Sequence, residues 1–247
     1  MANLSSIQDA FGREIYDYWR GDTTACEIVE RDDGYIDAGF GPKAYFAPFK
    51  DWPMHERKAI RLARGRVLDV GCGAGRCVLY LQEKGHRVVG IDISPLAIFV
   101  TRQRGAKKAV IRSVTQIAPD LGLFDTILMY GNNFGLFGSF SRARWLLRRL
   151  YHVTTQNARI IAGSTDPYRT TLPEHLAYHK RNRRRGRMSG QLRLRIRYFK
   201  YCTPWFDYLL ASQDEVKQIL DGTGWGIHRF FDSPGPMYCA VIEKAGK

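Results

Sequence analysis

Three glycines at alternate positions, preceded by a carboxylate, form the stretch of this sequence with the clearest chemistry. The segment 69–75 reads Asp-Val-Gly-Cys-Gly-Ala-Gly and follows an apolar strand at 66–70. Glycines permit positive φ and let a ligand lie against bare backbone. A dinucleotide-binding fingerprint would place its third glycine at Arg76, and Asp69 would repel a diphosphate. The pattern therefore favours a ligand that carries an ammonium and a sulfonium group.

A second carboxylate, Asp92, ends the next predicted strand, 17 residues after Gly75. A carboxylate at this place can accept hydrogen bonds from both hydroxyls of a ribose. In open α/β sheets, ligands bind beyond the carboxyl ends of the strands, near the first strand-to-helix turn. The glycine segment and Asp92 are therefore expected to serve one ligand.

Strands and helices alternate between residues 66 and 165, which predicts a parallel sheet covered by helices on both faces. A closing pair of strands indicates that one late strand runs antiparallel. We therefore predict an α/β fold with a doubly wound, mostly parallel sheet and an antiparallel edge strand. The predicted strands lie at 66–70, 86–92, 107–114, 124–130, 158–165, 225–231 and 237–244.

The segments outside this alternation define the predicted domain organisation. Residues 1–60 are predicted to form an N-terminal cap of helices and loops, and residues 61–247 the main domain. An insertion at about 166–211 interrupts that domain. Within it, apolar and basic residues alternate strictly from Gln191, which predicts an antiparallel ribbon.

The glycine segment belongs to a larger pattern. Together with Val-Val-Gly-Ile-Asp-Ile-Ser-Pro at 88–95, it resembles the first two motifs of class I S-adenosylmethionine-dependent methyltransferases. The segment 124–136 resembles that family's fourth-strand motif. The resemblance covers roughly residues 60–165 and the closing strands. It implies a seven-stranded Rossmann-like sheet, S-adenosyl-L-methionine as cofactor and S-adenosyl-L-homocysteine as product.

Carried over by position, the family's motifs imply a set of cofactor-binding residues. Asp69 and its glycines would face the methionine part, Asp92 the ribose, and Ile93 would pack on the adenine. Many relatives place an aspartate at the end of the third strand, where this chain has Ser113 or backbone to bind the adenine amine. The implied set is Asp69, Gly71, Cys72, Gly73, Gly75, Asp92, Ile93, Ser113, Tyr130 and Asn132.

The catalytic and acceptor groups are less defined, because methyl transfer needs a base only when the acceptor must lose a proton. His175 and His179 share one face of a predicted short helix, and Tyr168 follows the fifth strand. These three are candidate bases, or else side chains of a cap. Asn132 and Asn133 line an acceptor pocket or serve a turn. The loop lacks the Pro-Pro of many amino methyltransferases, and no metal site is predicted.

Most of the net charge of +14 comes from one segment. Between Lys180 and Lys200 there are ten Lys/Arg residues and no Asp or Glu. Arg193, Arg195 and Arg197 share one face of the predicted ribbon. Such a face suits the phosphates or carboxylates of a substrate. A solvated face, or pairing with acids elsewhere in the chain, explains the arginines equally well.

The sequence thus predicts a methyltransferase that acts on an O or N atom of a small, acidic molecule. The alternatives are a nucleic-acid (RNA) methyltransferase that uses the basic ribbon, and a protein that binds the cofactor without catalysis. A cytoplasmic protein without membrane contact is expected, because no apolar run reaches roughly 18 residues. Five cysteines without a CxxC pair indicate reduced thiols. The oligomeric state stays open.

Overall fold

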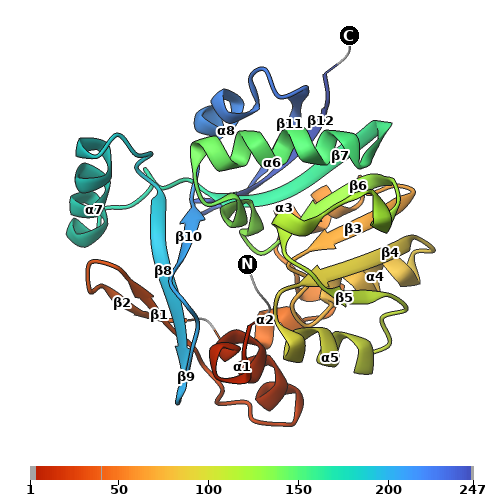
Figure 1. Ribbon diagram of the computed structural model, residues 1–247, viewed down its shortest axis with the longest axis horizontal. Helices are drawn as coiled ribbons and strands as arrows, with labels where there is room; N and C mark the ends of the chain where they lie inside the picture. Colours follow the sequence, from red (N-terminus) through yellow and green to blue (C-terminus); the bar gives the residue numbers. More distant parts are fainter. Residues whose placement is uncertain (1–3, 40, 246–247) are drawn as a thin grey trace. The chain divides into compact units, whose positions relative to one another are not determined.

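The computed structural model describes residues 4–39 and 41–245 and contains a mixed seven-stranded sheet in the order β11-β12-β7-β6-β3-β4-β5 (Figure 1). The predicted class of fold is confirmed. The antiparallel strand is β12, which lies between β7 and β11, so it is one strand in from the edge and not at it. The strands are β3 Arg66–Val70, β4 Arg87–Asp92, β5 Ala109–Ile111, β6 Phe124–Met129, β7 Thr154–Thr165, β11 Trp225–Asp232 and β12 Met237–Lys244.

The chain divides into two compact units, and neither ends at the predicted domain boundary of residue 60. Unit 1 contains residues up to 52, 65–117 and 194–206. Unit 2 contains 53–64, 118–193 and residues from 207 onwards. The N-terminal segment therefore belongs to the same unit as the glycine loop, because its helix packs there and forms no separate core.

Within unit 1, β3, β4 and β5 are parallel, and the register pairs Asp69 with Gly90. Helix α4 Arg76–Glu83 begins directly after the glycine loop, and α5 Pro95–Gln103 begins after Ser94, whose hydroxyl accepts a hydrogen bond from Ala97 N. A serine cap followed by a first-turn proline fixes this helix start. Both helices thus start at the carboxyl ends of the strands that precede them.

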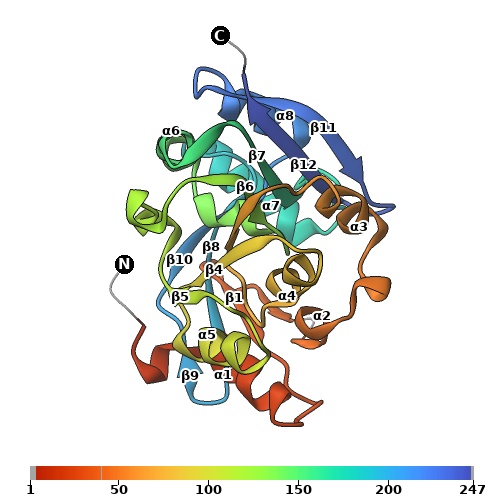
Figure 2. The ribbon, with the colours of Figure 1, turned by 90° about the vertical axis from the view of Figure 1, so that its right-hand side faces the viewer.

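The N-terminal segment is less helical than predicted. Helix α1 Ala10–Trp19 packs beside α5, as Figure 2 shows. It is followed by the hairpin β1 Ile28–Arg31 and β2 Ile36–Ala38, where loop and helix were expected. The hairpin forms because β1 pairs with β8 Gln191–Tyr198, a partner distant in sequence. Short helical turns complete the segment, namely η1 Ser6–Gln8, α2 Lys43–Phe46 and η2 Phe49–Asp51.

The predicted ribbon forms the core of a second sheet in the order β10-β8-β1-β2. Its strands are β8, the short β9 Tyr201–Cys202, which pairs with β8, and β10 Phe206–Leu209. Before the ribbon, α7 Pro173–Arg184 extends the predicted short helix into residues that we expected to be a basic loop. The strict alternation of apolar and basic residues was therefore sufficient to predict β8.

The helices of unit 2 accompany β6, β7, β11 and β12. Helix α6 packs against α8, while α3 contacts β7, β11 and β12 (Figure 2). A capping box opens α8, as predicted. Among the residues that the structure describes, no helix is long and apolar enough to cross a membrane. These elements are α3 Met54–Ile60, α6 Phe140–His152, α8 Gln213–Leu220, η4 Pro119–Leu121 and η5 Asn133–Phe137; η3 Val114–Gln116 belongs to unit 1.

Candidate functional site

The glycine loop between β3 and α4 has the left-handed backbone that its sequence predicts. Gly71, Gly73 and Gly75 have φ values of +72°, +53° and +82°. At Gly75 a side chain is excluded by contact as well, since a Cβ would lie 2.9 Å from Cγ2 of Thr101. The backbone N–H of Gly71 donates to the carbonyl of Ile91 at 2.8 Å, which holds the loop against the end of β4. The loop is thus a rigid turn with bare backbone.

Asp92, at the end of β4, holds the loop and the next helix together. Its Oδ2 accepts a hydrogen bond from Gly73 N and its Oδ1 from Ser94 N, each at 3.0 Å. Burial raises the pKa of Asp92 above its usual value, although these two N–H groups favour the charged form. Each carboxylate oxygen has two acceptor sites, so capacity remains for ribose hydroxyls. Its assignment to the ribose stays a prediction.

Asp69 is the clearest unsatisfied group at this end of the sheet. Its residue is 2% exposed, and its Oδ2 makes no hydrogen bond with any residue that the structure describes. Burial raises the pKa of Asp69 to about 7, opposed by the charge of Arg76 and reinforced by that of Asp92. A buried polar atom without a partner is costly. A ligand ammonium would satisfy this oxygen and favour the ionised carboxylate, so the site fits the expected cofactor.

Three other predicted cofactor residues of unit 1 differ in what they offer. Ile93 follows Asp92 and is 39% exposed, so its apolar side chain is available to stack on a flat ring. Cys72 is buried, and burial raises the pKa of its thiol well above the usual value, so the thiol is unreactive. Ser113 caps η3 with its hydroxyl, and its N–H donates to Gln116 Oε1 at 3.0 Å. Ser113 therefore has local partners already.

Two buried carboxyl side chains of the N-terminal segment escaped the sequence analysis. Asp9 caps α1 by accepting from Gly12 N at 3.1 Å, and its other oxygen accepts from Leu96 N at 3.0 Å. Glu14 is fully buried, and burial together with Glu27 raises its pKa to about 9, so it is neutral near pH 7. An aspartate before an apolar helical run was a readable capping signal. Nothing local indicated that Glu14 is buried.

The remaining cofactor and acceptor candidates lie in unit 2, after β6. The Tyr130 hydroxyl donates to the carbonyl of Glu56 at 2.8 Å. Asn132 has φ +68°, so it occupies the left-handed turn position that we considered for it. Its carbonyl accepts from the Tyr208 hydroxyl at 2.6 Å, while its buried Oδ1 has no hydrogen-bond partner among the described residues. Asn133 is half-buried and begins η5.

The structure brings two of the three candidate bases together. His179 is 6% exposed and its ring contacts that of Tyr168 edge-on, with centroids 6.2 Å apart. The Tyr168 hydroxyl donates to Glu215 Oε1 at 2.8 Å, and burial and that bond raise its pKa. His175 is half-buried, with Nδ1 3.2 Å from the hydroxyl of Thr170. Tyr168 is thus held in its protonated form.

The three ribbon arginines all have acidic partners. Glu30 of β1 binds Arg195 through both oxygens, at 2.7 Å each, and Arg197 at 3.2 Å. Arg193 pairs with Asp207 at 3.3 Å, and both of those side chains are exposed. The pairing of β1 with β8 places Glu30 opposite Arg195. Among these arginines, Arg193 has the partner that a ligand would displace most easily.

Comparison with known proteins places this geometry in a family. A model described as "Methyltransferase domain" matches residues 67–157. A 2-heptyl-1-hydroxyquinolin-4(1H)-one methyltransferase of Mycobacteroides abscessus is 37% identical over 71 residues, which are 29% of this chain and 30% of the relative. A human lysine N-methyltransferase named for an ATP synthase component is 29% identical over 48% of this chain and 50% of its own length. The matched segments thus span at most half of these two relatives.

Solved structures extend the likeness to the whole chain. An S-adenosylmethionine-dependent methyltransferase from Bacteroides fragilis, in complex with S-adenosyl-L-homocysteine, superposes with a TM-score of 0.84 and 26% identity over 99% of this chain and 98% of its own. The CcbJ methyltransferase from Streptomyces caelestis shares the fold, with a TM-score of 0.65 and 14% identity over 98% of this chain and 99% of its own. This is the Rossmann-like methyltransferase fold. The chain belongs to the class I S-adenosylmethionine-dependent methyltransferase family.

Proposed function

We propose that this protein transfers the methyl group of S-adenosylmethionine to an O or N atom of a small, acidic molecule. The observation that supports it most directly is the unsatisfied, buried Oδ2 of Asp69 beside a loop of left-handed glycines. In this proposal Asp69 binds the ammonium of the cofactor, Asp92 the ribose hydroxyls, and Ile93 packs on the adenine. The bound cofactor supplies an activated methyl group on its sulfonium.

The chain's own contribution to the reaction is chiefly positioning. The rigid loop and the two carboxylates hold the methyl donor in one orientation, so that an acceptor atom placed in line with it is in near-attack geometry. A base is required only for an acceptor that keeps its proton at neutral pH. His179 is the candidate for that role, because Tyr168 is held protonated by Glu215. Asn132 Oδ1, buried and without a partner, is a candidate contact to the acceptor or cofactor.

An acidic acceptor is supported by Arg193, whose exposed pair with Asp207 is weak and easily displaced. Arg195 offers less support, since Glu30 already occupies its guanidinium. That same pairing reduces the support for a nucleic-acid substrate, which would need a row of available cations. The relative with a quinolone named as its substrate adds to the case for a small acceptor.

The test is incubation of the purified chain with S-adenosylmethionine labelled in the methyl group and a fractionated cell extract. We expect label in the small-molecule fraction. Label in RNA would replace the proposal by a nucleic-acid methyltransferase, and label in protein by a protein methyltransferase. A chain that binds the cofactor by calorimetry yet labels nothing would be a cofactor-binding protein without catalysis.

A further inference from the structure

A basic pocket lies at the amino ends of the strands of unit 1, away from the glycine loop. It encloses about 410 Å³, within the range of small-molecule sites. Strand β3 starts in this pocket at Arg66 and ends at the glycine loop, five residues further along. At about 3.3 Å per residue the two places are roughly 15 Å apart. The pocket is therefore separate from the candidate cofactor site. Its lining is Arg66, Gln82, Gly85, His86, Arg87, Val88, Val89, Lys107 and Lys108.

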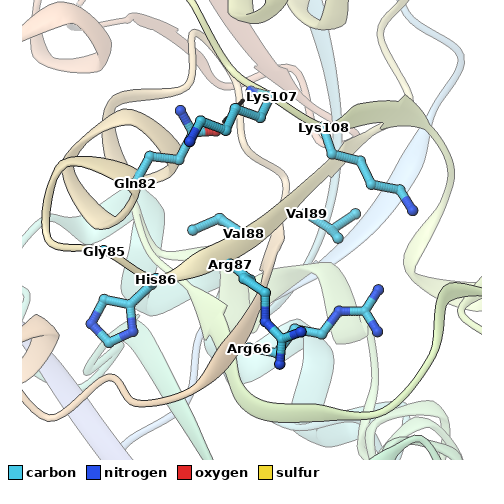
Figure 3. A pocket seen from close by; sticks show the side chains of 9 residues that line it. All are labelled: Arg66, Gln82, Gly85, His86, Arg87, Val88, Val89, Lys107 and Lys108. Atoms are coloured by element: carbon cyan, nitrogen blue, oxygen red, sulfur yellow. Dashed lines mark hydrogen bonds between the residues drawn. The ribbon is translucent and has the colours of Figure 1, made fainter.

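Four permanent cations reach this pocket from three segments of the chain, and no acidic residue lines it. Arg66 and Arg87 are register partners on β3 and β4, so their side chains start side by side, as Figure 3 shows. Lys107 and Lys108 come from the loop that precedes β5 (Figure 3). The side chains of Arg87, Lys107 and Lys108 are exposed and make no ion pair with any described residue. These charges differ in this respect from the arginines of β8.

The backbone that presents the cations is held in place by hydrogen bonds. The amide of Gln82 accepts from Lys107 N at 2.8 Å and donates to the carbonyl of Gly105 at 3.2 Å, which ties the lysine loop to α4. His86 Nδ1 lies 3.2 Å from the carbonyl of Gly65, so this nitrogen is the donor. The carbonyl of Lys108 accepts from Gly90 N at 3.0 Å. The pocket is therefore preorganised, which lowers the entropic cost of binding.

We propose that this pocket binds a small ligand with several phosphate groups, such as a di- or triphosphate. Guanidinium groups bind phosphate oxygens through two parallel hydrogen bonds, while the lysines add point charges. Four converging cations match the charge of an oligophosphate better than that of a single carboxylate. Their arrangement around a pocket, and not along a row, favours a compact anion over a nucleic-acid backbone, whose phosphates need an extended track.

Calorimetric titration of the full chain with tripolyphosphate at low ionic strength tests the proposal. We expect saturable binding at one site that weakens as salt is added. The double variant Arg87→Gln/Lys108→Gln should bind at least about tenfold more weakly, because two charge-assisted contacts are lost. The matched control Lys58→Gln/Lys200→Gln removes the same charge from exposed positions elsewhere and should bind like the wild type.

Unchanged affinity for S-adenosylmethionine in the pocket variant will show that the variant is folded, and Lys107→Gln replaces it if it is not. The proposal is overturned if titration is not saturable, or if the control variant loses as much affinity as the pocket variant. Pocket-dependent binding of a single-stranded RNA oligonucleotide, without binding of tripolyphosphate, would overturn it in favour of a nucleic-acid surface. None of these outcomes depends on the methyl acceptor.

Discussion

Asp69 on β3 and Arg195 on β8 are both charged side chains at candidate binding positions, and their surroundings differ. Asp69 is buried, and one of its oxygens has no hydrogen-bond partner among the described residues. Arg195 is bound by both oxygens of Glu30 at 2.7 Å. A ligand gains the full interaction with the first group but must displace a carboxylate from the second. Binding capacity therefore follows from unsatisfied groups and not from the presence of charge.

The largest effect is expected from Asp69→Asn, which keeps the shape of the side chain but removes its charge. Loss of one partner of a buried charge pair costs about 2–5 kcal/mol, so cofactor affinity should fall at least about thirtyfold. The variant should be at least as stable as the wild type at pH 8, because a buried charge without a partner is gone. Calorimetry and thermal unfolding measure the two quantities. Unchanged affinity would remove Asp69 from the site.

The pH dependence of binding sharpens the same point. With a pKa of about 7 in the ligand-free protein, Asp69 is ionised above pH 7 and protonated below it. If the cofactor binds the ionised form, its affinity should be constant above pH 7 and fall about tenfold per unit below it. Asp69→Asn should abolish this slope. A wild-type profile that is flat from pH 5 to 8 contradicts the assignment.

The same raised pKa affects stability in the opposite direction along the pH scale. The native state holds the Asp69 proton more tightly than the unfolded chain, whose aspartates titrate near 3.9. The contribution is therefore fully present below about pH 4 and is lost as pH rises through about 7. Comparison of unfolding midpoints for wild type and Asp69→Asn across this range isolates it. The two curves should converge at the acidic end.

A moderate effect is expected from Asp92→Ala. Loss of a hydrogen bond to a charged group should weaken cofactor binding at least about tenfold. The free energy of unfolding should also fall, because the N–H groups of Gly73 and Ser94 lose their acceptor. The exposed Asp37→Ala is the charge-matched control and should change neither quantity. Full affinity in a folded Asp92 variant would move the ribose contact elsewhere.

The smallest effect is expected on β8, once the acceptor is known. Arg193→Lys should raise the KM for the acceptor about two- to fivefold and leave cofactor affinity unchanged, since an exposed pair contributes little. Arg195→Lys is the comparison, and it should leave this KM unchanged because Glu30 holds that position. If the Arg193/Arg195/Arg197 triple alanine variant keeps the wild-type KM at every ionic strength, the arginine face has no part in acceptor binding.

Patterns confined to neighbouring residues were sufficient for much of the fold. The glycine spacing predicted the left-handed turn after β3, since positive φ is a property of single residues. Ser94 and Pro95 predicted the start of α5, and alternation predicted β8. The position of β12 one strand in from the edge did not follow from such patterns. It depends on how β7 and β11 both pair with it.

The sequence by itself determined the class of fold, the glycine loop and the two carboxylates at the ends of β3 and β4. Only the tertiary structure decided which charges are available. Glu30 neutralises an arginine 165 residues away, and the basic pocket gathers Arg66, Arg87 and Lys107 from three segments. The physical reason is that desolvation and pairing depend on neighbours in space, which the order of residues along the chain does not reveal.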